Sequence, residues 1–266
     1  MLVIKMSTYR IATFNLKNDM PLTRKFLRWQ TRKDAVMECI KEIDADILGV
    51  QEYTIEMAKS LAPLKSIYTT VGSPRNKKPK ESSERTDIFF KKDKFNCLEY
   101  RTFWLSNSPD KKGSRLFFSP FPRICTMAKL EDKKTKDVLW IFNTHLDHLL
   151  PFNRNKETKI LIESIAKDTN IKNIVLMGDL NTNIESNAVK ALLNNPIYPL
   201  FSVYKNIDIS NTMHYGSGRL KESKLPIDYI FVGKEFRVLS THIIRDEFEG
   251  LYPSDHYPVV TEIEFK

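Results

Sequence analysis

Residues 173–181 read NIVLMGDLN, and this stretch combines the two features on which the fold and the chemistry of the chain depend. Its first part, Ile174–Met177, is a short apolar run that begins with two β-branched residues, which is typical of a buried strand. Asp179 and Asn181 follow that run almost at once. The stretch therefore predicts a buried strand whose carboxyl end carries a carboxylate and an amide.

The same pattern recurs at three other apolar runs. Asn15 ends YRIATFN, Glu52 ends DILGVQE, and His145 and Asp147 end VLWIFNTHLD. Each of these residues taken singly is adequately explained as a turn former or a helix cap. Together they predict polar groups at the carboxyl ends of several buried strands.

Three polar residues stand at the opposite end of their runs. Asp228 lies at the start of IDYIFV, and Asp255 and His256 precede the run from Tyr257 to Phe265. If these strands run antiparallel to the first set, their amino ends meet the carboxyl ends of the others. We therefore expect all these groups to lie at one edge of the core.

The remaining pattern indicates an α/β fold with more strands than helices. Residues 32–43 carry Val36, Cys39, Ile40 and Ile43 at helical spacing, and further helices are expected at 155–168 and 186–193. The apolar runs predict strands at 9–16, 46–52, 88–91, 98–105, 126–131, 138–145, 174–177, 227–232, 236–244 and 257–265. This order favours sheets covered by helices over a purely parallel doubly wound fold. No Gly-, Pro- or Ser-rich linker interrupts the chain, so we expect a single domain over residues 1–266.

Composition narrows the choice of partners. The chain has 42 Lys and Arg against 33 Asp and Glu, a formal charge of +9, which attracts nucleic acids, phosphorylated small molecules or anionic membranes. The three cysteines, Cys39, Cys97 and Cys125, are far apart, which argues against a disulfide framework or a zinc site. No apolar run is long enough to span a membrane and no signal peptide is evident, so we expect a cytoplasmic protein, with no protein partner evident.

Several acids at one edge of a core require compensation. Burying carboxylates near one another is costly unless a cation or another partner offsets their charge. Mg²⁺ takes oxygen ligands and is commonly held by one or two carboxylates, and Mn²⁺ accepts similar ligands. The sequence therefore predicts a divalent cation, with Mg²⁺ favoured and Mn²⁺ as an alternative.

Six of these motifs, in this order, resemble the endonuclease/exonuclease/phosphatase superfamily. They are TFNL, GVQE, NTHLDH, MGDLN, IDYIFV and YPSDHYPV, and they extend from about residue 8 to about residue 260. TFWLSNSPD at 102–110 and FPRICTMAKL at 121–130 also resemble the bacterial branch related to pancreatic deoxyribonuclease and the deadenylases. The resemblance implies a four-layered α/β/β/α sandwich with two packed, largely antiparallel sheets.

The resemblance also implies roles for the polar residues. Glu52 is similar to the principal metal-binding carboxylate, supported by Asn15 and Asp255, and Asp147 is a further supporting residue. Asp179 and Asn181 resemble the pair that orients the attacking water and contacts the phosphate. His256 resembles the essential histidine, paired with Asp228, and His145 a second, phosphate-contacting histidine whose partner by spacing is Glu84. Whether Asp179 or His256 is the base stays open.

The implied activity is metal-assisted hydrolysis of phosphodiesters by water. A nuclease is favoured by the net charge and by Arg75, Lys77, Lys78 and Lys80 on the polar segment 72–87, which we expect to be an exposed loop beside the site. The alternatives are a phosphatase or phosphodiesterase acting on a small sugar, nucleotide or lipid phosphate, and a catalytically inactive binding module on the same fold. Residues 81–87 and 111–122 depart from the pattern of the branch, so the resemblance does not fix the substrate.

Overall fold

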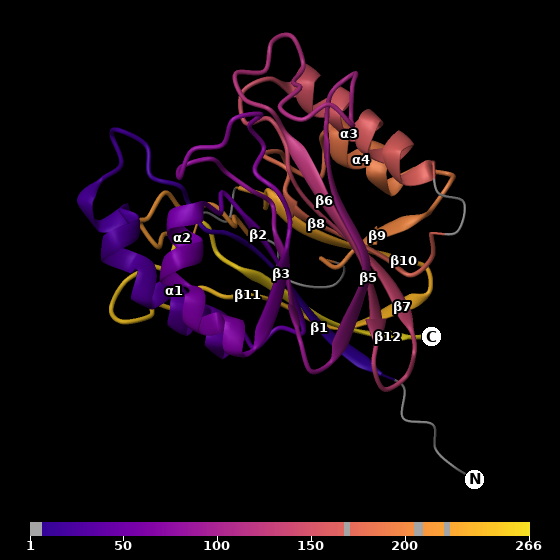
Figure 1. Ribbon diagram of the computed structural model, residues 1–266, viewed down its shortest axis with the longest axis horizontal. Coiled ribbons are helices and arrows are strands. Elements are labelled where there is room, and N and C mark those ends of the chain that lie inside the picture. The colour runs from indigo at the N-terminus through magenta and orange to yellow at the C-terminus, as the bar shows by residue number, and fades with distance from the viewer. Residues whose placement is uncertain (1–6, 168–170, 205–209, 221–223) are drawn as a thin grey trace.

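Two six-stranded sheets pack together between two layers of helices (Figure 1). The structure, a computed structural model, describes residues 7–167, 171–204, 210–220 and 224–266. The first sheet has the order β11 (Phe236–Ile243), β12 (Val259–Phe265), β1 (Thr8–Asn15), β2 (Ile47–Gln51), β4 (Ile88–Lys91), β3 (Tyr68–Val71). The second has the order β5 (Phe95–Trp104), β6 (Ile124–Asp132), β7 (Val138–His145), β8 (Ile174–Asp179), β10 (Asp228–Gly233), β9 (Leu200–Ser202).

Most neighbouring strands are antiparallel, and the exceptions lie at the centre of each sheet. Only β1 with β2 and β7 with β8 run parallel among the described pairs. β10 runs antiparallel to β8, which sets Asp228 directly opposite Asp179, and β12 runs antiparallel to β1. The predicted meeting of strand starts and strand ends at one edge is confirmed.

The helices form the two outer layers. On the first sheet lie α1 (Trp29–Ile43) and α2 (Ile55–Ser60), with Val36 and Ile40 in one core cluster with Phe14 and Leu48. On the second sheet lie α3 (Pro151–Ala166) and α4 (Asn187–Leu193). Figure 1 shows these two helix pairs on opposite sides of the strands. The α/β/β/α arrangement is therefore present, with two short 3-10 helices at Lys25–Leu27 and Ala62–Ser66.

The boundaries of several elements differ from the expected ones. α1 begins at Trp29 rather than at residue 32, and α3 begins at Pro151 rather than at 155, while its expected end at 168 lies outside the described residues. α2, β3 and β9 were not expected, because each has six residues or fewer and too few positions to reveal a period. Cys39 and Cys125 are fully buried, in keeping with the sequence.

The expectation of an exposed loop at 72–87 is wrong for its two ends. Only residues 77–82 are exposed, whereas Arg75 and Asp87 are 8% and 1% exposed. The Arg75 backbone N–H donates to the Glu84 carbonyl at 3.0 Å, and the Arg85 guanidinium lies 2.8 Å from the Asp87 carboxylate. The segment folds back on itself because its charged side chains find partners within it.

A polar contact joins the two sheets beneath the site. The Asn143 amide on β7 donates to the Val50 and Asp87 carbonyls of the other sheet at 2.9 and 2.8 Å. Gln51 on β2 in turn donates to the Asn143 side-chain oxygen at 2.7 Å. A Cβ on Gly49 would lie 2.8 Å from the Asn143 side chain, so this crossing needs a glycine. The bonds fix how the strands of the two sheets are placed relative to each other.

Gly178 precedes the polar end of β8 at a position where only a glycine fits. Its φ is +145°, and a Cβ there would lie 1.9 Å from the Thr144 carbonyl oxygen of β7. A larger residue would push apart the two parallel strands that carry His145 and Asp179. The glycine therefore sets the separation of those two side chains.

One buried acid in the helix layer is poorly compensated. Glu157 on α3 is fully buried, and one carboxylate oxygen accepts from the Asp147 backbone N–H at 2.8 Å. The other oxygen has no hydrogen-bond partner within the described part of the chain. Burial raises the pKa of Glu157 to about 8, although the Asp147 N–H and Arg123 act against it.

We predict that the free energy of unfolding of the Glu157→Gln variant falls less than that of the parent as the pH rises. A folded pKa raised from 4.5 to about 8 means that the parent loses stability as pH rises through this window, because the unfolded chain releases the proton first. Gln stays neutral and keeps an acceptor, so its advantage should grow with pH, up to about 5 kcal/mol at about 1.4 kcal/mol per pKa unit. Urea unfolding at several pH values measures this, with the exposed Glu163→Gln as control. If the free energies of unfolding of the parent and Glu157→Gln changed in parallel with pH, the pKa of Glu157 would not be raised in the folded protein.

Candidate active site

The polar residues of the motifs meet where the strands of both sheets end. Asn15 stands at the centre, at the end of β1. Its amide nitrogen donates to Glu52 Oε1 at 3.1 Å and to Asp179 Oδ2 at 2.9 Å. Its oxygen accepts from the Lys17 backbone N–H at 2.9 Å. One buried amide therefore ties a carboxylate of the first sheet to a carboxylate of the second.

Glu52 is held in an unusual backbone conformation. Its φ is +55°, a left-handed value that non-glycine residues adopt rarely and that is associated with functional sites. Glu52 Oε2 accepts from the Asn18 backbone N–H at 2.6 Å. Burial alone would raise the pKa of Glu52, but Lys17, the Asn18 N–H and Asn15 outweigh it and lower the pKa. The side chain is therefore a carboxylate at neutral pH.

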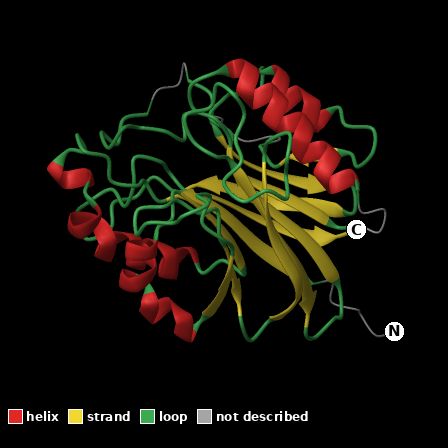
Figure 2. Ribbon diagram, turned by 45° about the horizontal axis from the view of Figure 1, so that its top comes forward, coloured by secondary structure: helices red, strands yellow, loops and turns green. Residues whose placement is uncertain are grey.

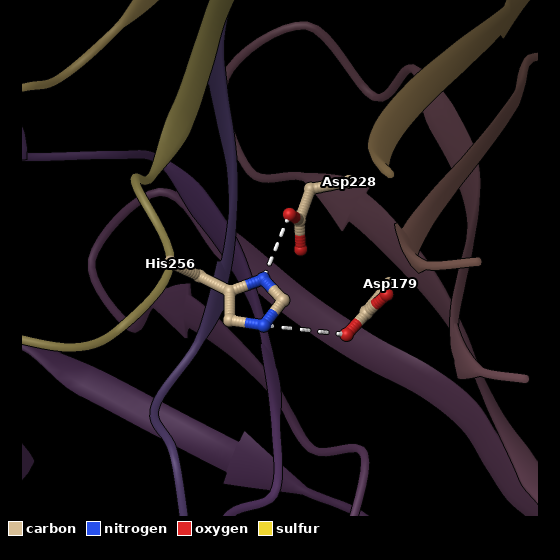
Figure 3. Close-up of side chains that lie close together, drawn as sticks. All are labelled: Asp179, Asp228 and His256. Atoms are coloured by element: carbon tan, nitrogen blue, oxygen red, sulfur yellow. Dashed lines mark hydrogen bonds and ion pairs between the residues drawn. The ribbon is translucent and has the colours of Figure 1, made fainter. Parts of the chain in front are cut away.

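His256 and Asp228 form a hydrogen-bonded pair (Figure 3). His256 Nδ1 lies 2.9 Å from Asp228 Oδ2, and the Thr212 hydroxyl donates to the same oxygen at 2.6 Å. Burial disfavours a charged imidazole, but Asp228 and Asp179 outweigh it and raise the pKa of His256 well above its usual value. The pair orients the ring so that Nε2 points towards Asp179, 3.8 Å from its Oδ2.

Asp179 lies between two imidazoles. His145 Nε2 is 3.6 Å from Asp179 Oδ2, and Asn181 donates its backbone N–H to Asp179 Oδ1 at 2.8 Å. Burial first, and then Asp228, raise the pKa of Asp179 to about 7, against the opposing effect of His256. For His145, burial and the guanidiniums of Arg123 and Arg75 lower the pKa well below its usual value, which keeps that ring neutral. The edge thus combines a neutral and a charged imidazole around one carboxylate.

The donors at this edge fit a hard divalent cation. Asp255 is 6% exposed, and its Oδ1 is buried without a hydrogen-bond partner in the described ranges. Burial raises the pKa of Asp255, and the neighbouring Glu52 charge raises it further. Glu52 and Asp255 are neighbouring carboxylates, and one oxygen of Asp255 is buried without a hydrogen-bond partner among the described residues. Mg²⁺ and Mn²⁺ take oxygen ligands of this kind. A cation bound there would remove the cost of holding both acids ionised.

A second grouping of ligand atoms is Asp179, Asp228 and His256, whose atoms lie within 4.8 Å of one another. Here His256 Nδ1 is already bonded to Asp228 Oδ2, which also accepts from Thr212. A metal at this point would have to compete with those two short bonds. We therefore regard Glu52 with Asp255 as the better candidate for a cation, and the Asp228–His256 pair as a proton-handling unit.

These groups line an open cleft of about 620 Å³. Its wall includes Glu52, His145, Asp179, Asn181, Asp255 and His256. Lys78 and Lys80 also reach it, whereas Lys77 is not part of the described lining. Asn181 donates a side-chain N–H to the Leu146 carbonyl at 3.0 Å, which holds its amide at the rim. The cleft brings together most of the residues that the sequence predicted; the exceptions in its described lining are Asn15, Lys77, Asp147 and Asp228.

The predicted pairing of Glu84 with His145 is wrong. The Glu84 carboxylate binds Arg75, with one contact of 3.0 Å, and lies 3.4 Å from the Asn18 amide. Arg75 is correspondingly not a free cation on a loop, because it is paired with the Glu84 carboxylate, whose pKa burial raises against the opposing effect of Arg75. Asp147 is fully buried and lies beside the site without entering it, since its two oxygens accept from the Leu149 and Leu150 N–H groups and from the Ser119 hydroxyl. Its oxygens hold the turn at Leu149 and Leu150 that leads into α3.

Sequence reasoning missed two cations at this site. Arg123 is 4% exposed, lines the cleft and lies 2.9 Å from His148 Nδ1 through its Nη2. Arg32 on α1 is fully buried and donates to the carbonyls of Leu27, Leu16, Lys17 and Pro253. The signal for Arg32 was its position four residues before Val36, on the apolar stripe. Arg123 stands among prolines and phenylalanines and gave no comparable signal.

Comparison with known proteins agrees with this geometry. The model of the Endonuclease/Exonuclease/phosphatase family matches residues 12–256. An endonuclease/exonuclease/phosphatase from Bacteroides vulgatus is 30% identical with a TM-score of 0.87, covering 98% of this chain and 100% of that one. A mannosyl-6-phosphatase from Bacteroides thetaiotaomicron is 26% identical with a TM-score of 0.87, covering 97% and 100%. The human Nocturnin catalytic domain, 19% identical with a TM-score of 0.76 over 97% and 95% of the two chains, shares the fold.

A search of curated proteins found no significant match. The family match nevertheless extends over most of the chain, from the first motif to His256 in the sixth. The chain therefore belongs to the Endonuclease/Exonuclease/phosphatase family and is a hydrolase of phosphate ester bonds.

Proposed function

We propose that the protein is a divalent-cation-dependent phosphatase whose substrate is a small molecule with a terminal phosphate. The observation that carries this proposal is the position of Arg75 and Arg123 in the cleft beside His145. Both guanidiniums are almost buried, at 8% and 4% exposure, and both have a buried Nε without a partner in the described residues. Such recessed cations suit a phosphate that enters end-on, with its two negative charges, better than one within a continuous backbone.

The size of the cleft supports the same conclusion. Small-molecule sites have volumes of about 300–1,000 Å³, and the cleft of about 620 Å³ lies in this range. The sequence favoured a nuclease because of its basic loop, but Lys77 lies outside the described lining of the cleft. The 26% identity with a mannosyl-6-phosphatase over 97% of this chain also favours a phosphorylated sugar.

We propose the following roles for the residues of the edge. Glu52 holds the cation, with Asp255 beside it and Asn15 fixing the carboxylate. The cation, when bound, neutralises charge on the phosphate oxygens. His145 and Arg123 donate to the phosphate, and Asn181 positions the attacking water next to Asp179.

Proton transfer falls to Asp179 and His256. The raised pKa of Asp179, about 7, suits a group that accepts a proton from water near neutral pH. His256, kept charged and oriented by Asp228, holds a proton at Nε2, within reach of the leaving oxygen. The exchanged assignment requires a neutral His256 that takes the proton from water and a protonated Asp179 that gives one to the leaving oxygen.

A nuclease remains the second candidate, favoured by Lys78 and Lys80 in the lining of the cleft. On this view the two lysines neutralise backbone phosphates on either side of the reacting one. Each such contact adds a slope of about 0.7 on single strands to a plot of log affinity against log salt.

The substrate test is a hydrolysis panel with Mg²⁺ and Mn²⁺. We predict a kcat/KM at least roughly tenfold higher for sugar monophosphates than for DNA or RNA, since a factor of ten is only about 1.4 kcal/mol of transition-state binding. The double variant Lys78→Ser, Lys80→Ser should leave sugar monophosphate hydrolysis nearly unchanged, with Lys77→Ser as the matched control. Efficient cleavage of nucleic acid, with a salt slope that flattens in the double variant only, would establish the nuclease instead.

Glu52→Gln tests the metal assignment. The substitution keeps the shape and removes the charge, so we predict a loss of more than about 100-fold in Mg²⁺ affinity, beyond what is typical for residues that only support a ligand. Titration calorimetry measures binding, and the exposed Glu56→Gln is the control. Unchanged Mg²⁺ binding by a folded Glu52→Gln protein would remove Glu52 from the metal site.

The Asp228–His256 pair is tested by a double-mutant cycle. We predict that His256→Ala and Asp228→Asn each lower kcat by about 10²- to 10⁴-fold, and that the double variant is scarcely worse than either, because the two residues act as a unit. His242→Ala, an exposed histidine on β11, serves as the control. Penalties that multiply would mean that the two residues act independently.

A further inference from the structure

The face that carries the cleft is unusually rich in exposed apolar side chains. Three segments surround the cleft at the end of the sheets: residues 16–28 after β1, residues 105–123 between β5 and β6, and residues 146–152 after β7. They carry eight of the 16 exposed large apolar side chains of the described chain. Figure 2 shows the long loops gathered at one end of the strands, away from the C-terminus. The asymmetry marks this end as a contact surface.

The first segment forms one rim of the cleft. Met20 lines the cleft and is 52% exposed, and Leu22 at the tip is 95% exposed. Phe26 is 41% exposed on the following turn. The same segment bears Arg24, Lys25 and Arg28 on its surface, and its one acid, Asp19, accepts from the Trp29 backbone N–H. This rim therefore presents apolar tips among cations.

The second and third segments form the opposite rim and are joined to each other. Ser119 donates to Asp147 at 2.7 Å, and the Phe121 and His148 rings stack at 6.4 Å in the lining of the cleft. Phe117 is 90% exposed. Its neighbour Phe118, 65% exposed, packs edge-on against it. The two rings thus form an apolar tip on the segment that also lines the cleft through Phe121 and Arg123.

More apolar and basic groups continue this rim. Leu149, Leu150 and Phe152 are 55%, 39% and 66% exposed where α3 begins. Lys111, Lys112 and Arg115 are exposed on the segment that carries Phe117, against one acid, Asp110. Arg115 is held by the carbonyls of Ser119 and Pro120, which fixes its charge next to the aromatic tip.

We propose that this face docks onto an anionic lipid bilayer, with the apolar tips entering the interface and the cations pairing with lipid phosphates. Exposed aromatic and aliphatic side chains on a basic surface bind membranes in this way. Nucleic acid is less well suited, because Leu22, Met20 and Leu149 cannot stack on bases as aromatic platforms do. A second copy of the chain is disfavoured, since a two-fold contact through this face would set its cations against themselves.

Docking would hold the mouth of the cleft over the lipid headgroups. The substrate would then be a phosphorylated lipid headgroup. This second claim rests on the proposed phosphatase function, whereas the docking claim does not. No helix in the described ranges is long and apolar enough to cross a membrane.

Vesicle co-sedimentation of the full chain tests docking without measuring hydrolysis. We expect binding to vesicles of phosphatidylcholine with phosphatidylserine, little binding to phosphatidylcholine alone, and weakening at high salt. Phe117→Ser with Phe118→Ser, and separately Leu22→Ser, should each weaken partitioning roughly tenfold. Leu239→Ser, an exposed leucine on β11, should have no effect, and hydrolysis of a soluble monophosphate should be unchanged in all these variants.

Three results would overturn the proposal. The first is that the chain does not bind anionic vesicles. The second is that the variant with Phe117→Ser and Phe118→Ser binds them as well as the parent. The third is that these variants abolish self-association in analytical ultracentrifugation, or binding of single-stranded nucleic acid, instead of vesicle binding. Failure of hydrolysis on every substrate would leave vesicle binding intact, so the two proposals fail separately.

Discussion

The Asn15 amide connects the two halves of the structure at the point where chemistry takes place. By donating to Glu52 on one side and to Asp179 on the other, it holds the ends of β2 and β8 together across the two sheets. The Gln51–Asn143 contact beneath it and the close approach of β7 and β8 at Gly178 fix the same strands deeper in the core. The active-site edge is therefore as rigid as the packing of the sheets, which is what positioned catalytic groups require.

The electrostatic state of this edge follows from where the cations are. Arg32 lies behind the acids with four backbone carbonyls as its partners, so its charge is not cancelled by any one carboxylate. Burial lowers the pKa of Arg32 to about 10, while Asp19, Asp255 and Glu52 oppose that fall. Arg32 also joins the segment after Asn15 to the segment before Asp255, so it both offsets and positions the acids. A divalent cation in front of Glu52 would complete this compensation.

Most elements of the fold could be predicted from the sequence because they coincide with long apolar runs. Strands such as 138–145 and the helix containing Val36 and Ile40 have enough residues to show their period. The position of Asp228 before its strand agrees with the antiparallel pairing of β10 with β8, whereas the largely antiparallel sheets were implied by the family resemblance. Short elements such as α2 and β9 have no such signal, and their conformation depends on neighbours distant in the sequence.

The sequence predicted which site residues meet where these residues lie at the ends of strands, but not where they lie on loops. Asn15, Glu52, Asp179 and His256 meet as expected because strand topology alone brings them together. The partner of Glu84 could not be inferred, since spacing does not reveal that residues 72–87 fold back and place Arg75 against it. Arg123 and His148 come together only through the folding of residues 105–123.

The central claim is that the cation sits at Glu52 and leaves the Asp228–His256 pair free to move protons. Crystals soaked in Mn²⁺ and measured for anomalous scattering test it most directly. The account predicts a peak within about 2.5 Å of a Glu52 carboxylate oxygen, with the 2.9 Å contact between His256 and Asp228 retained. A peak among Asp179, Asp228 and His256, with that contact broken and none at Glu52, would contradict it.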